Sequence, residues 1–473
     1  MKTVELIKNR IKNSKIAVLG FGVSNIPLVE LLIACGNKIT VYDKKDYECL
    51  DYRAKEFAKN GVRFVTGENY LDNIDADIIF RSPGIRPDHS GIKKAIENGA
   101  ELTSEMEMFL ELTPAYVLGV TGSDGKTTTT TIAYKLLEKE FEESDTKIYV
   151  GGNIGTPLLS KVGEMTERDI CVVELSSFQL FTARKSVDRA VITNLSPNHL
   201  DWHKDMDEYI ASKTNIYRFG ATHLTLNGNN APSKELLVDD SIKLSLFSAD
   251  YSYEDMERKY KNNPNEKSES AMFIYDGHIY RYYNNHVLKV LNLDLILLPG
   301  RHNIENYMAA ISLTWGLVSE RTINYIAKTF VGVEHRLELV RVCDDVLYIN
   351  SSIDSSPSRT AAALSALPIK PIVICGGYDK NIPFEPLASA LDERAKAVVL
   401  TGATADKIKE VIDKSGSQIE VYLERDFENA VLKAKDISQK GDIVLLSPAC
   451  ASFDAFDNFM DRGNKYKEIV NNF

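Results

Sequence analysis

The sequence of 473 residues predicts an α/β protein of three domains, each built around a mostly parallel sheet. The first observation is the length, which is too great for one hydrophobic core at about 150 residues per domain. The second is that short apolar runs alternate with helical patterns, as in βαβ units. The third is that these runs fall into three successive series. We place the domains at residues 1–103, 104–332 and 333–473.

The first series begins with a strand at Lys15–Gly20 and a helix at Ser24–Ala34. A second strand is expected at Lys38–Asp43. A later strand, within Asp77–Gly84, ends in a turn that contains proline and glycine. This alternation predicts a small parallel sheet with its loops at one edge.

The second series consists of apolar runs at Ala115–Gly122, Ile170–Ser177 and Arg189–Ser196, each ending in small polar residues. Catalytic loops belong at such strand ends. The stretch 248–289 is polar and rich in tyrosine, and an Asp-Gly pair between two alternating runs indicates a hairpin. We interpret this stretch as an insertion. A third series, which again predicts an open α/β domain, lies at 346–350, 371–377, 397–402, 419–423 and 442–448.

Composition and charge oppose several classes of protein. Hydrophobic residues make up 44% of the chain and charged residues 26%, as in an ordinary soluble globular protein. The net charge of −11 opposes a nucleic-acid-binding surface. The N-terminal segment lacks the apolar core of a signal peptide, and the apolar stretches are shorter than the roughly 20 residues that span a bilayer. We therefore expect a cytoplasmic protein without membrane insertion, whose six scattered cysteines stay reduced.

The strongest local signal is a phosphate loop from Val120 to Thr128, between a predicted strand and a helix at Thr129–Glu138. Glycines let the backbone approach phosphate oxygens, and the start of the helix adds a partial positive charge. Lys126 can neutralise phosphate, and Thr127 can bind Mg²⁺. The Walker spacing is broken, because Val120 stands where that pattern has glycine. The candidate ATP-binding residues of the loop are Gly122, Ser123, Asp124, Gly125, Lys126, Thr127 and Thr128.

Three further side chains are candidates for chemistry beside this loop. Glu174 ends one predicted strand, and His199 follows the next one. A carboxylate there suits Mg²⁺, which prefers oxygen ligands. Lys213 lies on a predicted helix shortly after His199. Each residue also has an ordinary explanation: Glu174 could be a solvated carboxylate at a strand end, His199 a surface histidine, and Lys213 part of a solvated helix face. Only the shared position of Glu174 and His199 at strand ends favours a site.

Eight motifs in order along the chain resemble the Mur ligase family, and together they cover nearly its whole length. Eight motifs in register are far more specific than any single one. Two of them, VELSSFQL and SPACAS, are most similar to the D-glutamate-adding members. The motifs are TGSDGKTT, GGNIG (151–155), VELSSFQL, NHLD, YxxxK ending at Lys213, HRLE (335–338), GGYDK (376–380) and SPACASFDxF (447–456).

The resemblance implies an ATP-dependent amide ligase of cytoplasmic peptidoglycan precursor synthesis. ATP would phosphorylate the carboxylate of UDP-N-acetylmuramoyl-L-alanine, and the amine of D-glutamate would attack the acyl phosphate. The resemblance also implies two Mg²⁺ ions, an N-carboxylated Lys213, a Rossmann-like UDP-binding domain, a P-loop-type ATPase domain and a Rossmann-like C-terminal domain; we expect a monomer. The implied catalytic residues are Lys126, Glu174, His199 and Lys213, and the implied metal ligands are Thr127, Glu174, His199 and Lys213.

The resemblance assigns the UDP-substrate to loops of the N-terminal domain. The loop at Gly22 would receive the pyrophosphate at the start of a helix. Asn25 stands where the third glycine of a dinucleotide fingerprint would be, so an ordinary turn without a ligand remains an alternative. The implied UDP-substrate residues are Gly22, Val23, Ser24, Asp43, Lys44, Ser82, Pro83, Gly84 and Asn153.

In the C-terminal domain the resemblance assigns Arg336 to the ATP phosphates, with a surface ion pair as the alternative. Many family members carry an Asn-Asp-Ser-Lys segment, but Ser351 and Ile353 stand here in place of its aspartate and lysine. We expect Arg359 to supply the lost positive charge. The implied amino-acid-binding residues are Arg359, Lys380, Ser452 and Phe453.

Other functions remain open at this point. Within the enzyme class, the chain could add another amino acid, such as L-glutamate, or act as a folylpolyglutamate-type ligase. An NAD-dependent oxidoreductase with a fused ATP module would rest on the first loop and Asp43, but the missing third glycine opposes it. A non-catalytic nucleotide-binding scaffold would explain Ser351 and Ile353. The retained candidate catalytic residues argue against it, namely Lys126, Glu174, His199 and Lys213.

Overall fold

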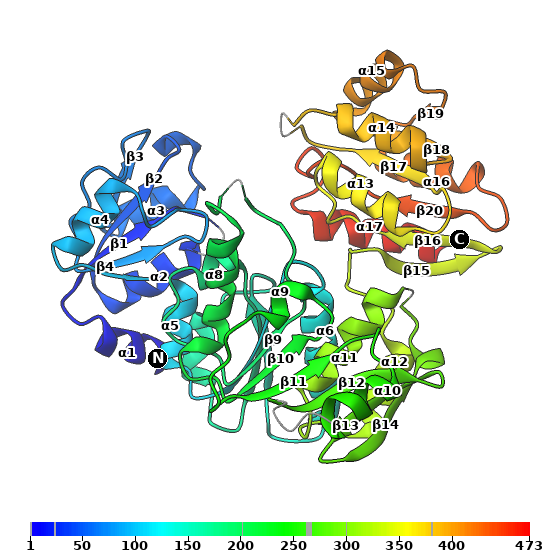
Figure 1. Ribbon diagram of the computed structural model, residues 1–473. Helices are drawn as coiled ribbons and strands as arrows, with labels where there is room; N and C mark the ends of the chain where they lie inside the picture. Colours follow the sequence, from blue (N-terminus) through cyan, green and yellow to red (C-terminus); the bar gives the residue numbers. More distant parts are fainter. Residues whose placement is uncertain (1, 23–24, 201, 262–266, 299, 380–381) are drawn as a thin grey trace. The chain divides into compact units, whose positions relative to one another are not determined.

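The computed structural model describes residues 2–22, 25–200, 202–261, 267–298, 300–379 and 382–473. Contacts divide the chain into two compact units, Met1–Phe330 and Val331–Phe473. Within the described residues, the first unit contains two sheets and the second contains one (Figure 1). The α/β class and the three-domain organisation are therefore confirmed, whereas the boundaries after residues 103 and 332 stay a prediction.

The N-terminal sheet has the strand order β3-β2-β1-β4-β5, with parallel pairs throughout. Leu19, at the end of β1, lies opposite Tyr42 and Arg81, so the loops after β1, β2 and β4 share one edge. The strands and the helix predicted before residue 85 are confirmed. The elements are α1 (Lys2–Arg10), β1 (Lys15–Leu19), α2 (Asn25–Cys35), β2 (Lys38–Asp43), η1 (Tyr47–Cys49), α3 (Arg53–Lys59), β3 (Arg63–Thr66), β4 (Ile78–Arg81), α4 (Ser90–Glu97) and β5 (Glu101–Thr103).

The central sheet has the order β14-β13-β12-β11-β10-β9-β6-β8-β7. β6 lies between β9 and β8 and is parallel to both. The register pairs Val120 with Glu174 and Thr121 with Ile192, so the loops after these three strands meet at one edge. Its strands are β6 (Tyr116–Thr121), β7 (Ile148–Gly152), β8 (Ile170–Glu174), β9 (Arg189–Ile192), β10 (His223–Asn227), β11 (Lys243–Phe247), β12 (Ser268–Tyr275), β13 (His278–Tyr283) and β14 (His286–Asn292).

Helices surround this sheet, and α6 and α11 pack against each other. The predicted helix at Thr129–Glu138 is confirmed as part of the longer α6. The helices are α5 (Glu105–Leu112), α6 (Lys126–Glu140), η2 (Leu159–Glu164), α7 (Ser177–Leu180), α8 (Met206–Arg218), α9 (Ala231–Lys234), α10 (Tyr253–Met256), η3 (Glu257–Lys261), η4 (Leu293–Leu295), α11 (Arg301–Leu313) and α12 (Glu320–Thr329).

The interpretation of residues 248–289 as an insertion is wrong, because the strands of this stretch continue the central sheet. β12 pairs in parallel with β11, and β12, β13 and β14 form an antiparallel edge. The predicted hairpin is confirmed between Tyr275 and His278. Asp276 and Gly277 have φ of 43° and 67°, the left-handed conformations of a two-residue turn.

The sheet of the second unit has the order β15-β16-β20-β17-β18-β19. The five strands of the third series are confirmed, and the antiparallel edge strand β15 was not predicted. β20 lies between β16 and β17, so the connections of neighbouring strands run to opposite sides of the sheet at this point. Ligands of open α/β sheets bind beyond the strand ends at such a position. The strands are β15 (Glu338–Cys343), β16 (Val346–Asn350), β17 (Ile372–Gly376), β18 (Ala397–Thr401), β19 (Glu420–Leu423) and β20 (Ile443–Leu446), and the helices are α13 (Pro357–Ala366), α14 (Glu385–Arg394), α15 (Ala405–Ser415), α16 (Phe427–Asp436) and α17 (Phe459–Asn471).

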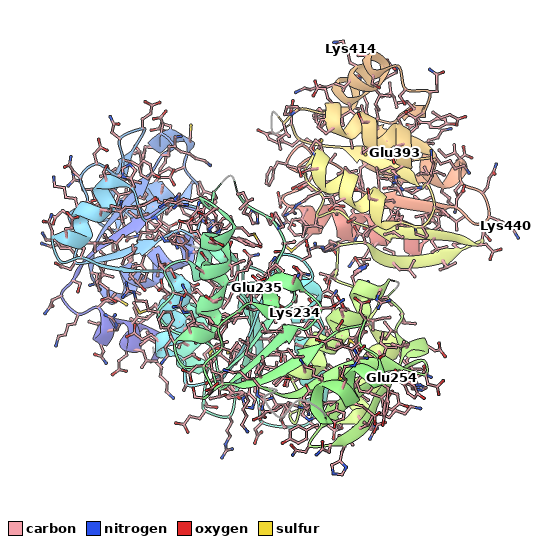
Figure 2. The ribbon with its side chains drawn as sticks, in the orientation of Figure 1. Lys234, Glu235, Glu254, Glu393, Lys414 and Lys440 are labelled. Carbon is pink, nitrogen blue, oxygen red and sulfur yellow. The ribbon has the colours of Figure 1, made fainter. Side chains whose placement is uncertain are left out.

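The hydrophobic cores follow this division. One core runs without interruption from the N-terminal sheet into the central sheet and includes Ile7, Phe109 and Ile192. Separate clusters fill the second unit. Charged side chains such as Glu254 and Lys414 lie on the outside (Figure 2). Among the described residues, no helix has the length and apolar character needed to cross a membrane.

A buried carboxylate lies where the two sheets of the first unit are joined. α5 begins after Ser104, whose side chain accepts a hydrogen bond from the N–H of Glu107. Glu105 is 8% exposed, and its Oε1 accepts a hydrogen bond of 2.9 Å from the N–H of Leu159. Burial raises the pKa of Glu105 to about 7. The folded protein therefore binds more protons here than the unfolded chain between about pH 4.5 and pH 7.

We expect Glu105→Gln to stabilise the protein above this window. The stability of the wild type falls as pH rises through it, because the folded state must give up a proton that it binds more tightly than the unfolded chain does. The displaced pKa corresponds to a difference of about 1–3 kcal/mol at pH 8 in favour of the variant. Thermal unfolding at pH 5 and pH 8 measures it. An equal difference in Tm at both pH values would contradict the assignment.

Candidate active site

The phosphate loop joins β6 to α6, and two of its glycines adopt conformations that disfavour other residues. Gly122 has a φ of 146° and Gly125 a φ of 77°. A Cβ added at Gly122 would lie 1.9 Å from Thr193 Oγ1, and one at Gly125 would lie 2.3 Å from Asn306 Oδ1. Both packing and conformation thus require glycine. α6 begins directly after Gly125, which leaves N–H groups of its first turn for a phosphate.

Hydrogen bonds fix the shape of the loop. The N–H of Ser123 donates to Asn194 O, and that of Asp124 donates to Asn194 Oδ1, both at 2.9 Å. Lys126 Nζ donates to the carbonyl oxygens of Gly122 and Ser123 at 3.0 Å each. The ammonium group therefore lies against the loop, where it can neutralise a bound phosphate.

The departure from Walker spacing has a physical reason. Val120 is fully buried within β6, and the strand continues to Thr121. A glycine at this position would remove a side chain from the core and weaken the strand. The part of the loop that can face phosphate begins at Gly122. Thr127 and Thr128 are half-buried in the first turn of α6.

Glu174 ends β8 and is 1% exposed. Its Oε1 accepts a hydrogen bond of 2.8 Å from Asn153 Nδ2, and its backbone carbonyl accepts one of 2.8 Å from the N–H of Asn153. Its Oε2 is buried and has no hydrogen-bond partner among the described residues. A buried carboxylate oxygen without a donor is costly unless a cation neutralises it, so this side chain fits a magnesium ligand.

Lys213 lies on α8 and is 2% exposed, which excludes the solvated helix face considered above. Its Nζ donates to Gly122 O at 2.7 Å and to Thr121 Oγ1 at 3.3 Å. The Nζ also lies 4.7 Å from the centre of the Tyr209 ring. Burial, together with the positive charge of Lys126, lowers the pKa of Lys213 well below its ordinary value.

The predicted catalytic side chains do not all lie at the same depth. The charges of Lys126 and Glu174 both act on Lys213, so the structure brings these three groups together. His199 is exposed in the loop after β9, has a φ of 54°, and its ring lies 4.8 Å from that of Phe178. Among the described residues, no group of three His, Cys, Asp or Glu side chains could hold a metal ion. The expected metal sites also use a threonine hydroxyl and a modified lysine, which such a group of three does not include. The observation that fits a cation is the buried Oε2 atom of Glu174, which has no hydrogen-bond partner among the described residues.

The loop after β1 is shaped by its own polar side chains. The carboxylate of Asp43 accepts hydrogen bonds from the N–H groups of Phe21 at 2.7 Å and Lys45 at 2.8 Å. Asn25 is buried and donates to Leu19 O and Gly20 O, which gives this position a role that glycine could not fill. Of the predicted UDP-substrate residues, Lys44 is exposed, and Val23 and Ser24 lie outside the described residues.

The turn Ser82-Pro83-Gly84 lies beside this loop. The N–H of Ser82 donates to Leu19 O at 2.9 Å, and a Cβ added at Gly20 would lie 2.9 Å from Ser82 Cβ. Trp202 Nε1 donates to Gly84 O at 3.0 Å. The turn therefore contacts both the first loop and the segment that follows His199.

In the second unit the loop after β16 carries a buried acid that sequence reasoning did not assign. Asp354 is 7% exposed, and its Oδ2 accepts a hydrogen bond of 2.9 Å from Ser447 Oγ, just beyond β20. Burial raises the pKa of this carboxyl above its ordinary value. Ser351 Oγ accepts the N–H of Leu337 at 3.1 Å, so this serine has a structural partner. Arg359 Nη1 donates to Ile353 O at 3.3 Å.

The remaining predicted residues of this unit differ in exposure. Ser452 is 2% exposed, whereas Phe453 is 63% exposed and its ring lies 5.9 Å from that of Tyr378. Arg336 is exposed in the segment before β15. Lys380 lies outside the described residues. The structure therefore leaves the amino-acid site as a set of predictions around the loops that follow β16, β17 and β20.

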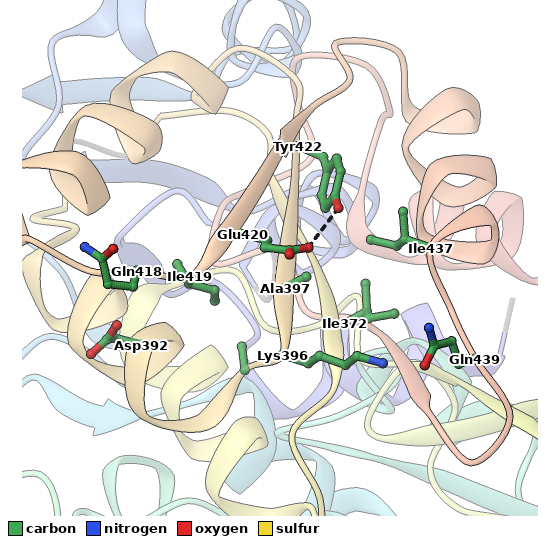
Figure 3. Close-up of a pocket in the computed structure, with 11 residues that line it drawn as sticks. Ile372, Asp392, Lys396, Ala397, Gln418, Ile419, Glu420, Tyr422, Ile437 and Gln439 are labelled. Atoms are coloured by element: carbon green, nitrogen blue, oxygen red, sulfur yellow. Dashed lines mark hydrogen bonds between the residues drawn. The ribbon is translucent and has the colours of Figure 1, made fainter.

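One cavity of the second unit has a volume of about 590 Å³ and lies at the opposite edge of its sheet (Figure 3). Its lining includes Ile372, Ala397 and Glu420, which are the first residues of β17, β18 and β19. Tyr422 donates a hydrogen bond of 2.9 Å to Glu420 within it. Ligand sites of open α/β sheets lie at the carboxyl ends of the strands, so we assign this cavity no part in the chemistry.

Sequence reasoning missed several residues that build the site. Asn194 is the second residue after β9, and its position just beyond a strand end was a usable signal. Tyr209 lies one helical turn before Lys213, and its hydroxyl is 2.8 Å from Ser123 Oγ. Asn306 Oδ1 accepts a hydrogen bond of 3.3 Å from Thr129 Oγ1, although the two residues are far apart in sequence. No motif or strand end near Asn306 in the sequence indicated that it would contact the phosphate-loop helix.

A glycine-bounded phosphate loop, a lysine against it and a buried carboxylate at the same edge of a parallel sheet define a P-loop-type, nucleoside-triphosphate-dependent enzyme. Three family models match the chain: the Mur ligase MurD-like N-terminal domain at residues 14–104, the Mur ligase middle domain at 120–314, and the Mur ligase glutamate ligase domain at 335–450. The chain belongs to the Mur ligase family.

Individual relatives agree with this assignment. The UDP-N-acetylmuramoylalanine--D-glutamate ligase of Clostridium novyi is 46% identical over 478 residues, which cover 100% of this chain and 99% of the relative. The crystal structure of UDP-N-acetylmuramate-alanine ligase MurC of Thermotoga maritima is similar with a TM-score of 0.50 at 17% identity, covering 97% of this chain and 100% of that one. MurF ligase of the same organism, in complex with ADP, has a TM-score of 0.50 at 15% identity and covers 92% and 96% of the two chains. The two structures show the fold alone.

Proposed function

We propose that this chain joins D-glutamate to UDP-N-acetylmuramoyl-L-alanine at the expense of ATP, through an acyl phosphate, in peptidoglycan precursor synthesis. The observation that carries the proposal is the 46% identity, along the full length of both chains, to a ligase named for this reaction. The phosphate loop, the buried Glu174 and the buried Lys213 support the ATP-dependent step, because they meet at one edge of the central sheet.

The residues of the central domain divide the work of phosphoryl transfer. Lys126 and the N–H groups at the start of α6 bind the phosphates and stabilise charge that develops during transfer. Thr127 and Glu174 would hold one Mg²⁺ ion, and His199 and Lys213 would serve a second. Mg²⁺, when bound, neutralises phosphate charge and so lowers the barrier to attack by the substrate carboxylate.

The substrates are assigned to loops at the edges of the other two sheets. In the first unit, the loop after β1 and the turn after β4 would bind the UDP portion, which matches their shared position beyond the strand ends. Asn153 would contact the same substrate beside Glu174, to which it is hydrogen-bonded. In the second unit, Arg336 would bind ATP phosphates, and the amino-acid residues would be Arg359, Lys380, Ser452 and Phe453.

The proposal includes an N-carboxylated Lys213. Only a neutral amine reacts with CO2, and the low pKa of this buried lysine favours that form. The carbamate would supply oxygen ligands where an ammonium group would repel a metal. We expect enzyme freed of CO2 to lose most of its activity and to regain it with bicarbonate. Full activity of CO2-free enzyme, unchanged by bicarbonate, would count against the modification.

The reaction is tested by phosphate release from ATP and Mg²⁺ with UDP-N-acetylmuramoyl-L-alanine and one amino acid at a time. D-glutamate, L-glutamate and other amino acids are compared, and the mass of the product is measured. Release with D-glutamate alone, with the mass of a glutamyl adduct, supports the proposal. Turnover with a different amino acid would retain the mechanism and change the acceptor. No turnover with any of them would favour a nucleotide-binding scaffold.

Arg359 gives a second test of the acceptor. It is a cation beside the loop in which Ile353 replaces the lysine of many family members. We expect Arg359→Ala to raise the KM for D-glutamate about tenfold or more, because a charge-assisted hydrogen bond to a carboxylate is lost. The KM for ATP should change little. Arg394→Ala is the matched control, since Arg394 is an exposed arginine of the same unit that pairs with its neighbour Glu393.

A cytoplasmic location and a monomeric state belong to the proposal as well. Sedimentation of the purified protein tests the second point. A dimer at the concentrations of the activity assay would contradict it.

A further inference from the structure

A buried arginine lies directly before the turn that is proposed to bind the UDP-substrate. Arg81 is the last residue of β4 and is 1% exposed. Its Nη1 donates to Pro83 O and Ile85 O at 2.8 Å each, and to Ser82 O at 3.3 Å. One nitrogen of the guanidinium group therefore binds the carbonyl oxygens of two turn residues, Ser82 and Pro83, and of Ile85 just beyond the turn.

The other terminal nitrogen of Arg81 reaches the central domain. Its Nη2 donates to Phe178 O at 2.8 Å and to Thr182 Oγ1 at 3.2 Å. Thr182 Oγ1 in turn donates to Glu107 Oε2 at 3.3 Å. Phe178 belongs to α7, a helix that starts three residues after Glu174. Arg81 thus contacts two segments. One is the Ser82-Pro83-Gly84 turn after β4 of the N-terminal sheet, and the other is α7, which follows Glu174 of the central sheet.

The surroundings of Arg81 make simple core packing a poor explanation. Burial lowers the pKa of Arg81 to about 10, and the carboxylate of Glu107, whose charge opposes this shift, is linked to the guanidinium group only through the hydroxyl of Thr182. A cation without a direct ion pair is costly to bury, and the Nε of Arg81 has no hydrogen-bond partner among the described residues. The hydrogen bonds of its two terminal nitrogens to five acceptors offset that cost only if the acceptors stay in place. The arginine therefore depends on the geometry of both segments and, reciprocally, fixes it.

The contacts of Phe178 extend this link towards the candidate metal ligands. Its ring lies 4.8 Å from the ring of His199 and 4.8 Å from that of Trp202. Trp202 returns to the turn, because its Nε1 donates to Gly84 O at 3.0 Å. The turn and α7 are therefore connected in two ways, through the hydrogen bonds of Arg81 and through the rings of Phe178 and Trp202.

We propose that Arg81 is a positioning residue that couples binding of the UDP-substrate at the Ser82-Pro83-Gly84 turn to the geometry of the Glu174 and His199 segments. The proposal rests on the proposed function. Occupation of the turn and binding of Mg²⁺ in the central domain then favour each other, since both require the arrangement that Arg81 holds. The residue itself touches neither substrate nor metal.

The test replaces Arg81 by methionine, which keeps an unbranched apolar stem and removes the guanidinium donors. We expect the KM for UDP-N-acetylmuramoyl-L-alanine and the Mg²⁺ concentration for half-maximal activity each to rise about tenfold, as the loss of charge-assisted hydrogen bonds predicts. The affinity for ATP, measured by equilibrium binding without the second substrate, should stay within about twofold of the wild type, since the phosphate loop keeps its own anchors. Thr182→Val removes one acceptor of the central domain and should shift the Mg²⁺ requirement more than the KM.

The controls separate positioning from stability. Arg10→Met removes another N-terminal-domain arginine, which pairs with Glu101 and Glu111 and does not contact the turn; both constants should stay at wild-type values. If R81M does not fold, Arg81→Lys, which keeps the charge and loses the fork of donors, is expected to show the same shifts. A lowered Tm with unchanged KM and Mg²⁺ requirement, in whichever variant folds, would overturn the proposal. Inactive wild-type enzyme would instead overturn the proposed function.

Discussion

Lys126→Met is expected to lower kcat by about a thousandfold or more. The ammonium group of Lys126 lies 3.0 Å from two carbonyl oxygens of the phosphate loop. In the proposed mechanism, negative charge grows at this position during phosphoryl transfer. Removal of one preorganised cation from such a site costs several orders of magnitude in rate. Methionine retains the apolar length of the side chain, so the fold should persist. Single-turnover phosphate release measures the chemical step.

The matched control for this variant is Lys135→Met on the same helix. Lys135 is half exposed and pairs with Glu138 at 2.7 Å, away from the loop. Its kcat should remain within about twofold of the wild type, as for an ordinary surface ion pair. A Lys126→Met enzyme that kept a tenth or more of the wild-type rate would remove the phosphate loop from the proposed mechanism.

Glu174→Gln is expected to abolish most activity and to weaken Mg²⁺ activation strongly. The substitution keeps the hydrogen-bond acceptor for Asn153 and removes the charge of the buried carboxylate. We expect a loss of about a hundredfold or more in kcat/KM, with partial recovery at high Mg²⁺ concentration, because the ligand to the cation is weakened. The activity of Glu164→Gln, an exposed glutamate of the same domain that pairs with Lys161, should not change.

A second measurement distinguishes a metal ligand from a structural carboxylate. The Oε2 atom of Glu174 has no hydrogen-bond partner among the described residues, so burial of this oxygen is costly when no Mg²⁺ is bound. Without Mg²⁺, Glu174→Gln should therefore have a Tm equal to or above that of the wild type. A much lower Tm without Mg²⁺ would mean that the carboxylate stabilises the fold, which would contradict the assignment.

Much of the fold followed from local sequence pattern, because buried parallel strands are continuous apolar runs with glycine and polar residues at their ends. β1, β6 and β8 were placed in this way, and so were the phosphate loop and Glu174. The edge strand β15 and the extension of the central sheet by β12 to β14 were missed. These strands pair with near neighbours in the chain, β15 with β16 across a two-residue turn and β13 with both β12 and β14. They were missed because such edge strands mix polar and apolar residues and lack the continuous apolar run of a buried parallel strand.

The candidate site was predictable to the extent that its residues follow strands. Asn306 and Arg81 escaped because their roles depend on distant contacts, with Thr129 in one case and with Phe178 in the other. The burial of Lys213 was also hidden, since one lysine on a helix has the same local pattern whether it faces solvent or a phosphate loop. Only the family motif identified Lys213 as a candidate. The structure then showed that it is buried and hydrogen-bonded to the phosphate loop.

The hydrogen bonds of Lys126 to its own loop have one further consequence. A long flexible cation usually loses rotameric freedom when its ligand binds, and that loss weakens binding. Here the side chain is already confined, because two carbonyl groups hold Nζ in place before any nucleotide arrives. In the proposed function, an incoming phosphate would meet a donor that is already fixed and would not need to order a mobile side chain. Much of the ordering entropy at this position is therefore lost during folding rather than during each catalytic cycle.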